Sequence, residues 1–412
     1  MDKMKLKRLI GKDGLPLIDL AAVIFFSLYY ILPSFSSSFN RTLVLFAGIA
    51  YFGYVFIRDR KVGISFISIF TAVTVIAFAF LILTDTKTVS ETASNRILKI
   101  FFSKFSQYFF MYLPGLLLIR VLKTANKEQK NLLLLLLVIL YTVVLYNTFI
   151  IILENPDAIR NWEEFANLED ENIGNYYFVY SVPIVITGLS VCMARLKGIR
   201  KIVCLGIIII LFVFLLLASY TLAILIAALG LVMQIFMSLK SPVTKILFLI
   251  VAVIGIFFIP DLLLFISENA PSNNMSVRFR ELYSFFTAGD SSGYNLNGRL
   301  TLYRKSIEAF FNSPITGNRN LNFDGHATFL TVLADTGIIG GIPFYYLLFS
   351  MNKRMKALLS ENARNFVPAF FCLLCMGFSN PIHNSLPLAF AVWFIVPLII
   401  NALINKEGEK VK

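Results

Sequence analysis

The chain has 412 residues, of which 58% are hydrophobic and only 15% are charged, and its mean hydropathy is +0.76. Soluble domains average about a quarter charged residues, so this composition excludes a soluble globular domain. The net charge of +13 is attributed to the flanks of membrane spans and not to nucleic-acid binding.

Apolar segments close to the ~20 residues needed to cross a bilayer recur along the whole chain. Inside lipid, only helices satisfy every backbone polar group in segments of this kind. The pattern therefore predicts an all-α polytopic membrane protein, with residues 1–412 forming a single membrane domain. Twelve spans are expected near residues 16–32, 41–57, 62–83, 97–119, 131–153, 176–194, 202–217, 220–238, 243–265, 327–350, 366–382 and 384–404.

The N-terminal stretch MDKMKLKRLIGKDG is basic, and the apolar segment that follows has no small-residue cleavage site. This favours a cytoplasmic flank over a removed signal peptide. With the N-terminus inside, 25 of the 37 Lys and Arg residues fall in short cytoplasmic loops and tails, as the positive-inside rule requires. Both termini are therefore predicted to be cytoplasmic.

The four cysteines lie in or at the ends of apolar segments, and they support neither a disulfide framework nor a zinc site. We interpret them as small buried hydrophobic residues. They are Cys192, Cys204, Cys372 and Cys375.

An acidic extracytoplasmic loop is predicted over residues 154–175, which hold seven acidic residues and one arginine, Arg160. Such a loop is usually a solvated surface. It is also suited to docking on a basic loop or to steering a glycan, and Arg160 is then a candidate contact for the acceptor.

The longest connection, residues 266–325, is predicted to be an extracytoplasmic loop between spans nine and ten. Loops of this length are uncommon unless they are functional or disordered, and aromatic and apolar residues argue against disorder here. In one stretch, Leu300, Tyr303, Ile307, Phe310 and Phe311 fall within roughly 100° on a helical wheel. An amphipathic helix is expected, capped by Asn297 and ended by Ser313 and Pro314. It would lie in the membrane interface or pack on the protein as a lid.

Five arginines precede one of the chain's two histidines within this loop: Arg278, Arg280, Arg299, Arg304 and Arg319, followed by His326. The guanidinium group is always charged and makes bidentate contacts with phosphate. The imidazole of histidine accepts a proton near neutral pH. Together these groups suit glycosyl transfer from a lipid diphosphate. The alternative is that His326 only caps a helix, as isolated histidines at helix ends usually do.

Residues 297–341 resemble the signature region of the O-antigen ligase and polymerase superfamily of bacterial membrane proteins. That signature contains an arginine, an aromatic-containing helix, proline, glycine and histidine, then an acid nine residues later and a glycine eleven residues later. The matching residues here are Arg299, Tyr303, Pro314, Gly317, His326, Asp335 and Gly337.

The resemblance implies a GT-C-like fold of about twelve spans in the bacterial cytoplasmic membrane, with one large late extracytoplasmic loop. It also implies metal-independent transfer of undecaprenyl-diphosphate-linked glycans. The chain departs from the family pattern in three places. Ala327 follows the histidine where Asn or Ser is common, and Asp335 replaces a commoner glutamate. The hairpin between spans seven and eight has Ser219 followed by Tyr220, where ligases have a Ser-Arg pair.

Within the superfamily, the sequences GRLTLYRKSIEAFFNSPITG and GHATFL are closer to those of polymerases of capsule, exopolysaccharide or O-antigen repeat units than to those of ligases. The expected reaction is inverting transfer, in which His326 is the general base on a sugar hydroxyl. Arg299 would stabilise the diphosphate leaving group. Other substrate-binding candidates are Arg278, Arg280, Arg304, Arg319, Arg160 and Tyr303.

No metal or cofactor is expected, because guanidinium groups would supply the positive charge. The expected partners are an undecaprenyl-diphosphate-linked oligosaccharide, the lipid bilayer, and the flippase and chain-length regulator proteins of such a pathway. No nucleic acid is expected as a partner.

Two further features carry weaker predictions. Lys104 lies within a span, where charges usually pair, and Asp335 is its predicted partner. His383, in NPIHNS, is predicted to lie in an extracytoplasmic turn, and it would either line the same cavity or be structural only.

Alternative functions remain open at this stage: a ligase, a flippase or other secondary transporter, a glycosyltransferase that uses a polyprenyl monophosphate sugar, and a scaffold. No convincing internal repeat supports a transporter. The first extracytoplasmic loop, PSFSSSFN, has no acidic residue of the kind that monophosphate-dependent enzymes carry there.

Overall fold

The computed structural model describes residues 14–83, 93–155, 158–160, 171–270, 273–289, 294–318 and 327–408. Most of these residues are helical, and none of them forms a strand. Eight helices in this part of the chain are long and apolar enough to cross a membrane, and a pair bent by 48° would be a ninth. The prediction of an all-α protein with several membrane spans is confirmed.

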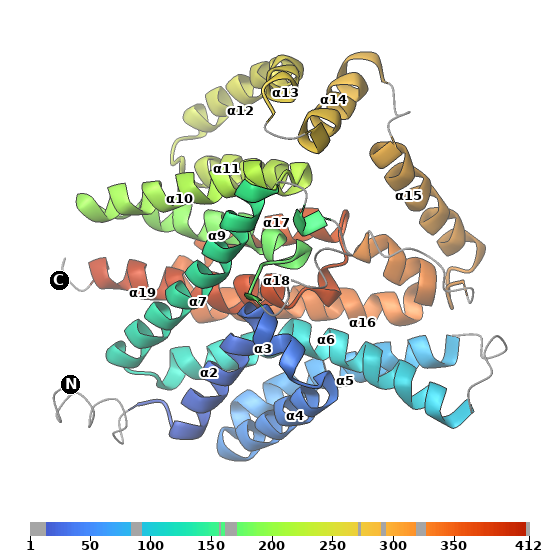
Figure 1. The fold of residues 1–412 in the computed structure, drawn as a ribbon. Helices are drawn as coiled ribbons and strands as arrows, with labels where there is room; N and C mark the ends of the chain where they lie inside the picture. The colour runs from blue at the N-terminus through green and yellow to red at the C-terminus, as the bar shows by residue number, and fades with distance from the viewer. Residues whose placement is uncertain are drawn as a thin grey trace.

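Every predicted span coincides with a helix or with consecutive helices (Figure 1). The ninth predicted span is the bent pair α12 and α13, and the last is a run of α18, η6 and α19. How many of these segments cross the membrane stays a prediction. The helices are α2 (Leu17–Ile31), α3 (Pro33–Ser38), α4 (Arg41–Arg58), α5 (Arg60–Leu83), α6 (Ala93–Thr124), α7 (Lys127–Glu154), η2 (Ala158–Arg160), α9 (Tyr176–Met193), α10 (Ile199–Leu217), α11 (Thr221–Ser238), α12 (Pro242–Phe257), α13 (Ile259–Glu268), α14 (Asn273–Ala288), α15 (Tyr294–Asn312), α16 (Thr328–Leu359), η4 (Ser360–Phe366), α17 (Val367–Gly377), η5 (Ile382–Asn384), α18 (Leu386–Phe390), η6 (Ala391–Ile395) and α19 (Val396–Gly408).

Asparagine side chains cap several of the helices at their first turn. Asn40 accepts a hydrogen bond from the backbone N–H of Thr42 at the start of α4. Asn126 and Gln129 form a capping box at the start of α7, and Asn175 caps α9. Each cap satisfies backbone donors that the first helical turn leaves unpaired, so the polar residues between apolar runs define where these helices begin.

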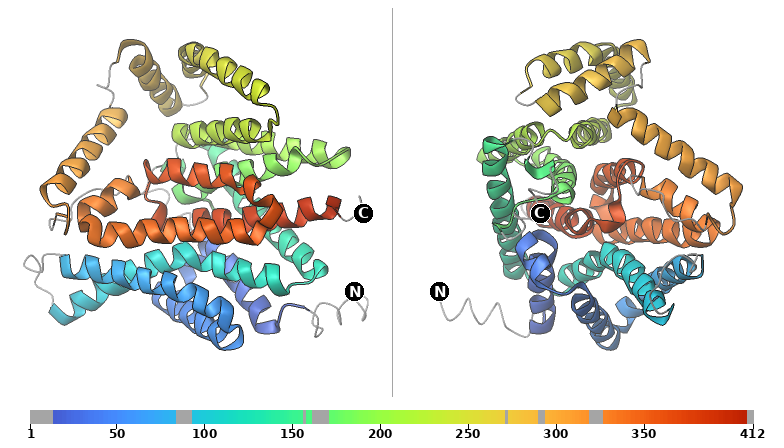
Figure 2. Two further views of the ribbon diagram at one scale, coloured as in Figure 1. Left: turned by 180° about the vertical axis from the view of Figure 1, so that it is seen from behind. Right: turned by 45° about the vertical axis from the view of Figure 1, so that its right-hand side comes forward.

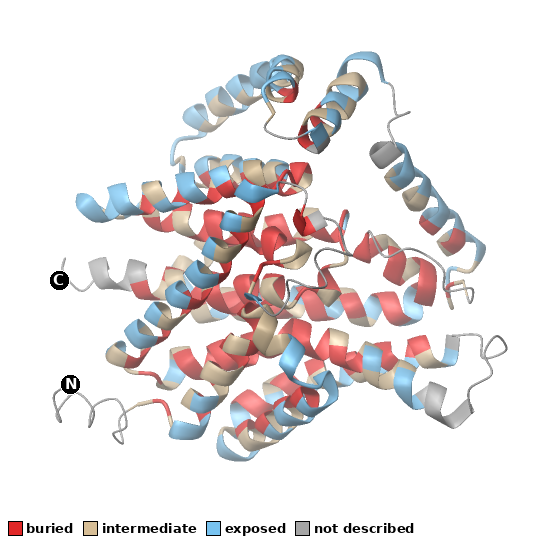
Figure 3. Ribbon diagram, in the orientation of Figure 1, coloured by how far each residue is buried: buried red, intermediate tan, exposed pale blue. Residues whose placement is uncertain are grey.

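Two helices form the centre of the bundle. In α6 and α9, 89% and 78% of the apolar window is buried inside the protein, against 28% in α7, α10 and α11. Buried residues concentrate in the middle of the molecule, and exposed residues line its outer helices (Figure 3). Many of those exposed side chains are large and apolar, as on α10 and α12, as expected of surfaces that face lipid and not water.

The start of α2 and the end of α19 lie on the same side of the bundle (Figures 1 and 2). Where these two ends lie relative to a membrane stays a prediction.

A buried charge network joins the helices on that side. The Arg120 guanidinium lies 2.7 Å from Asp19 Oδ2 and 3.1 Å from Asp59 Oδ2. The hydroxyl of Tyr51 donates to Asp19 Oδ1 at 2.8 Å. Arg120 is only 3% exposed, so an arginine counted among the flanking charges of a loop is in fact a cross-link between α2, α4 and α6.

Four helices, α12 to α15, arch over one side of the bundle in both views (Figures 1 and 2). A small core of Leu263, Met275 and Phe279 joins α13 to α14, and it packs against Leu216 and Ile224 at the adjoining ends of α10 and α11. No residue of α12 is buried. Where the structure describes it, the predicted loop of residues 266–325 begins within the end of α13 and carries the helices α14 and α15.

Candidate active site

The predicted site residues fall on three described elements, with two exceptions. Arg319 and His326 lie outside the described residues. Arg160 is the last residue of η2, and its side chain is not described. The remaining candidates lie on α14, which carries Arg278 and Arg280, and on α15, which carries Arg299, Tyr303 and Arg304.

Arg299 is half-buried and points toward the bundle. Its Nη1 donates to the backbone carbonyl of Ser379, 3.4 Å away, and the contact joins residues eighty positions apart. Tyr303, one turn further along α15, is also half-buried; burial raises the pKa of its hydroxyl, and the nearby Arg299 charge opposes that rise. These two candidates share one face of α15.

The other described arginines lie elsewhere. Arg304 is on the exposed face of α15, where its Nε lies 2.7 Å from Glu308 Oε1, and both side chains are more than half exposed. Such i,i+4 surface pairs contribute only about 0.3–0.5 kcal/mol. Arg280 is exposed on α14 and Arg278 is half-buried there. No contact among the described residues brings these three arginines to Arg299.

The helix α15 differs from its prediction at one end. It begins at Tyr294, so Asn297 lies inside the helix and the prediction that Asn297 is its cap was wrong; the predicted end at Ser313 is confirmed. Its most buried described side chains are Ser306 and Ala309, small residues that let α15 approach α16 closely.

The predicted apolar stripe of α15 is therefore not its packing face. Leu300, Ile307 and Phe311 are 41%, 44% and 72% exposed. The helix packs on the protein through one face and leaves these apolar side chains uncovered, as expected for a helix that also faces lipid.

The turn of residues 379–384, between α17 and α18, is the point where distant elements meet. The Oγ1 of Thr328, at the start of α16, donates to the Asn380 carbonyl at 2.9 Å and accepts from the Ile382 N–H at 2.8 Å. The hydroxyl of Tyr176, at the start of α9, donates to the Asn380 side chain. Because Arg299 binds the same turn, α9, α15 and α16 all converge on it, and Thr328 follows His326 by two residues.

His383 is the functional group that the sequence analysis undervalued. It is 9% exposed, its ring stacks on Tyr108 with centroids 5.5 Å apart, and its Nδ1 lies 3.2 Å from Thr328 Oγ1. Since the Thr328 hydroxyl already donates to Asn380, its remaining lone pair favours an Nδ1–H donor. Burial, and then the positive charges of Lys104 and Arg41, lower the pKa of His383 to about 3. A neutral imidazole of this kind is a weak base, so His383 holds the turn in place.

A break in α16 accounts for the glycines of the signature. Gly337 has φ 55° and ψ −151° in the middle of the helix. There the Ile338 N–H donates to the Pro314 carbonyl (2.9 Å), and the Asn318 N–H donates to the Ala334 carbonyl (2.7 Å). The segment after α15 thus supplies the backbone partners that the break removes. Non-helical backbone at membrane depth is tolerated only when it is satisfied in this way.

Only glycine fits at the two contact points of this junction. Gly317 has φ 70°, and a Cβ there would lie 2.4 Å from the Asp335 carbonyl group; a Cβ on Gly337 would lie 2.5 Å from the Ile315 carbonyl group. The Pro-x-x-Gly and Asp-x-Gly parts of the signature are therefore the two halves of one backbone joint between α15 and α16.

Asp335 lies directly before this break and is 7% exposed. Its carboxylate interacts electrostatically with Lys104 of α6, but no ion pair within 4.0 Å joins them in the described part of the chain. The Lys104 amine instead lies 4.4 Å from the centre of the Phe80 ring. The predicted pair is a long-range electrostatic interaction and not a contact, which places one acid and one base within the bundle near Tyr108.

The hairpin between α10 and α11 also borders this region. Ser219 has a positive φ of 57° at the turn, and Tyr220 packs its ring on Tyr176 and Tyr180, with centroids 5.6 and 5.8 Å away. The Tyr220 hydroxyl donates to the Ile159 carbonyl at 3.3 Å, which brings the backbone of Arg160 to the same neighbourhood. This hairpin therefore carries an aromatic cluster.

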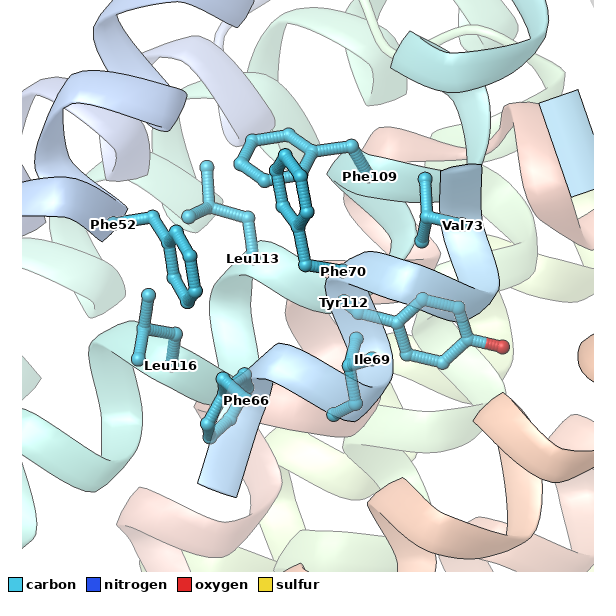
Figure 4. Close-up of a pocket in the computed structure, with 9 residues that line it drawn as sticks. All are labelled: Phe52, Phe66, Ile69, Phe70, Val73, Phe109, Tyr112, Leu113 and Leu116. Atoms are coloured by element: carbon cyan, nitrogen blue, oxygen red, sulfur yellow. The ribbon is translucent and has the colours of Figure 1, made fainter. Parts of the chain in front are cut away.

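A small apolar pocket lies between α4, α5 and α6 (Figure 4). Of its nine lining residues only Tyr112 has a polar side-chain atom, and its hydroxyl points away from the others (Figure 4). Its lining includes no residue of the 379–384 turn, so the pocket is apolar space apart from the candidate site.

The fold and the site together define an all-α membrane protein in which charged and aromatic groups gather around one turn between spans. Compared with models of known protein families and with curated proteins, the chain matches none.

Proposed function

We propose that this protein is a polymerase that joins undecaprenyl-diphosphate-linked oligosaccharide repeat units into a surface polysaccharide of a bacterial cell. The observation that carries the proposal is the convergence on the 379–384 turn. Arg299 binds the Ser379 carbonyl, and Thr328, two residues after His326, binds Asn380 and Ile382. Arg299 thus contacts, from α15, the same turn that binds Thr328, two residues after His326 in the sequence.

In the proposed reaction, a sugar hydroxyl of one lipid-linked unit attacks the anomeric carbon of the growing chain. The hydroxyl proton passes to His326, and the bond to the carrier diphosphate breaks with inversion. Arg299 binds the departing diphosphate. His383 is assigned no proton transfer, because its low pKa makes it a poor base. General-base catalysis contributes about 10²–10⁴-fold to the rate. Stabilisation of the negative charge on the departing diphosphate supplies much of the remaining rate enhancement.

The test uses purified protein in liposomes with the lipid-linked repeat unit extracted from its host. Arg299→Ala and His326→Ala should each reduce long polymer by about 100-fold or more at unchanged protein level, as judged by gel. Lys305→Ala, which removes an exposed charge from the same helix, is the matched control and should retain full activity. Polymer formed by the His326→Ala protein at the control rate would remove His326 from the base role.

A lipid-linked oligosaccharide flippase is the second candidate, and the break in α16 favours it. Transporters place charged groups at discontinuous helices within the membrane, and Asp335 lies beside such a break. The two functions differ in what a cell with Arg299→Ala accumulates. Single repeat units displayed on the outer face favour the polymerase, and units trapped inside favour the flippase. A ligase, which would transfer the glycan to another acceptor, is less favoured because Tyr220 occupies the hairpin position.

A further inference from the structure

Arg41, the first residue of α4, is a cation that no sequence motif marks. Its side chain is exposed, and its guanidinium carbon lies 5.8 Å from the centre of the Phe110 ring on α6. No carboxylate lies within ion-pair distance of it in the described part of the chain. Asn40 caps the same helix end, so the helix N-terminus adds partial positive charge beside the guanidinium. A permanent charge is held here without a protein counter-ion.

The helix α6, whose Phe110 ring lies under Arg41, also contacts the 379–384 turn. Two residues before Phe110, Tyr108 stacks on the His383 ring. The charge of Arg41 acts on His383 and also on Tyr177 of α9. Arg299 binds Ser379 in the same turn, and its charge acts on the preceding residue of α9, Tyr176. Arg299 therefore contacts the turn directly from α15, and the charge of Arg41 acts on the same turn from α4.

A diphosphate leaving group carries charge on two phosphorus centres, and one guanidinium can bind only one of them with both of its arms. The α10–α11 hairpin offers no second arginine, because Tyr220 packs there against Tyr176 and Tyr180. The amine of Lys104 lies inside the bundle, over the ring of Phe80. Among the side chains that the structure describes, Arg41 is an exposed cation whose charge acts on this turn.

We infer that Arg41 is a substrate-binding residue that, together with Arg299, holds the diphosphate of a polyprenyl carrier from two sides of the 379–384 turn. This inference rests on the proposed function and names the second contact of the same site. It assigns α4, which has no part in the sequence signature, to the binding of the carrier.

Farnesyl diphosphate and farnesyl monophosphate are suitable probes, because they share a short isoprenoid tail and differ by one phosphate. Their binding to the full chain in lipid nanodiscs would be measured by titration calorimetry, without any glycan. Arg41→Gln should weaken farnesyl diphosphate binding about tenfold, the effect of losing one charge-assisted contact. It should weaken monophosphate binding less. Arg41→Lys keeps the positive charge but loses the two-armed guanidinium group. Its affinity for farnesyl diphosphate should therefore lie between those of the unaltered protein and of Arg41→Gln.

Arg58→Gln is the matched control, because Arg58 is an exposed arginine in the last turn of the same helix, about 25 Å from Arg41 at 1.5 Å per residue. Its affinity for both probes should equal that of the unaltered protein.

The outcomes of the two tests are distinguishable. If Arg41→Gln and Arg58→Gln bind farnesyl diphosphate equally well while Arg299→Gln binds it more weakly, the role of Arg41 is overturned and the proposed polymerase function is not. Tenfold weaker binding in Arg41→Gln, with polymer still formed by Arg299→Ala, supports Arg41 as a diphosphate contact and overturns the polymerase mechanism. No binding of farnesyl diphosphate by the unaltered protein overturns both.

Discussion

At the scale of single residues, only one of the chain's two histidines lies in the part of the chain that the structure describes. His383 is buried against Tyr108 and Thr328, and the charges of Lys104 and Arg41 act on it. His326 lies in the segment between α15 and α16, where the sequence places it after a series of arginines. A histidine held neutral and hydrogen-bonded organises its surroundings, so we assign the catalytic role to the other one.

The burial of His383 predicts a pH dependence of stability. An ordinary histidine has a pKa of about 6.5, whereas that of His383 in the folded protein is about 3. Below pH 6.5 this histidine therefore binds a proton in the unfolded chain but not in the folded chain. The free energy of unfolding then falls by up to about 1.4 kcal/mol per pH unit toward pH 3. Above pH 7 the group contributes no pH dependence.

Thermal unfolding of the detergent-purified protein between pH 7.5 and 4.5 measures this effect. His383→Asn, whose amide nitrogen occupies the position of Nδ1, should show a shallower loss of melting temperature with acid than the unaltered protein. Identical slopes in the two proteins would mean that His383 is protonated, or solvated, in the folded state.

At the scale of the elements, the joint between α15 and α16 sets the geometry of the site. It fixes the helix that carries Arg299 against the helix that begins at Thr328, and it does so through backbone hydrogen bonds. Because the joint consists of backbone hydrogen bonds, substitutions of the surrounding side chains are expected to change its geometry little. The two glycines, by contrast, allow no Cβ.

Gly337→Ala is therefore expected to destabilise the protein by about 2–3 kcal/mol or more, because its backbone region is essentially restricted to glycine and a Cβ would overlap the Ile315 carbonyl group. Gly255→Ala is the control: that glycine lies within α12 with open space around it, and alanine there should be neutral or stabilising by up to about 1 kcal/mol. Melting temperatures of the two variants, compared with the unaltered protein, measure the difference. A Gly337→Ala protein as stable as Gly255→Ala would mean that the break is not required.

The sequence predicted the positions of the helices but not this joint. Apolar length located every segment, because the need to satisfy the backbone in lipid leaves few alternatives. The break at Gly337 falls inside an apolar run that reads as one helix, and its partner segment is some twenty residues earlier. The contact of Arg299 with Ser379 joins residues eighty positions apart, which periodicity within a helix cannot reveal.

The same limit applies to the residues of the site. Arg299 was predicted because it stands in a motif with Tyr303 and Pro314. For His383 the sequence left open whether it lines the cavity or is structural, and its burial against Tyr108 favours the structural role. Arg41 was not predicted, because it is isolated in sequence and becomes significant only through its neighbours in space. A cation at the start of a span, with no acidic residue near it in sequence, is the one signal that could have drawn attention to it.

At the scale of the whole molecule, the bundle is cross-linked by charge on the side where α2 begins and α19 ends. Arg120 is bound there by Asp19 of α2 and by Asp59, which lies between α4 and α5. Removing one partner of a buried charge group leaves the others uncompensated, which typically costs about 3–5 kcal/mol. The network therefore fastens the first helices of the chain to the central helix α6.

Arg120→Met should lower the melting temperature markedly, because Asp19 would remain buried without its counter-ion. Lys123→Met, which removes an exposed charge one turn further along α6, should leave the melting temperature unchanged. Thermal unfolding of the two purified proteins in the same detergent makes the comparison. Equal melting temperatures would indicate that water or detergent reaches the Asp19 carboxylate.

No residue of α12 is buried against the rest of the protein, and its side-chain contacts with α11 are those of Lys245 and Phe248 with the Phe236 ring. With so little packing, the thickness of the hydrocarbon layer largely sets the depth of this helix. Exchanges among valine, leucine and isoleucine along its exposed sides are therefore expected to leave the fold unchanged.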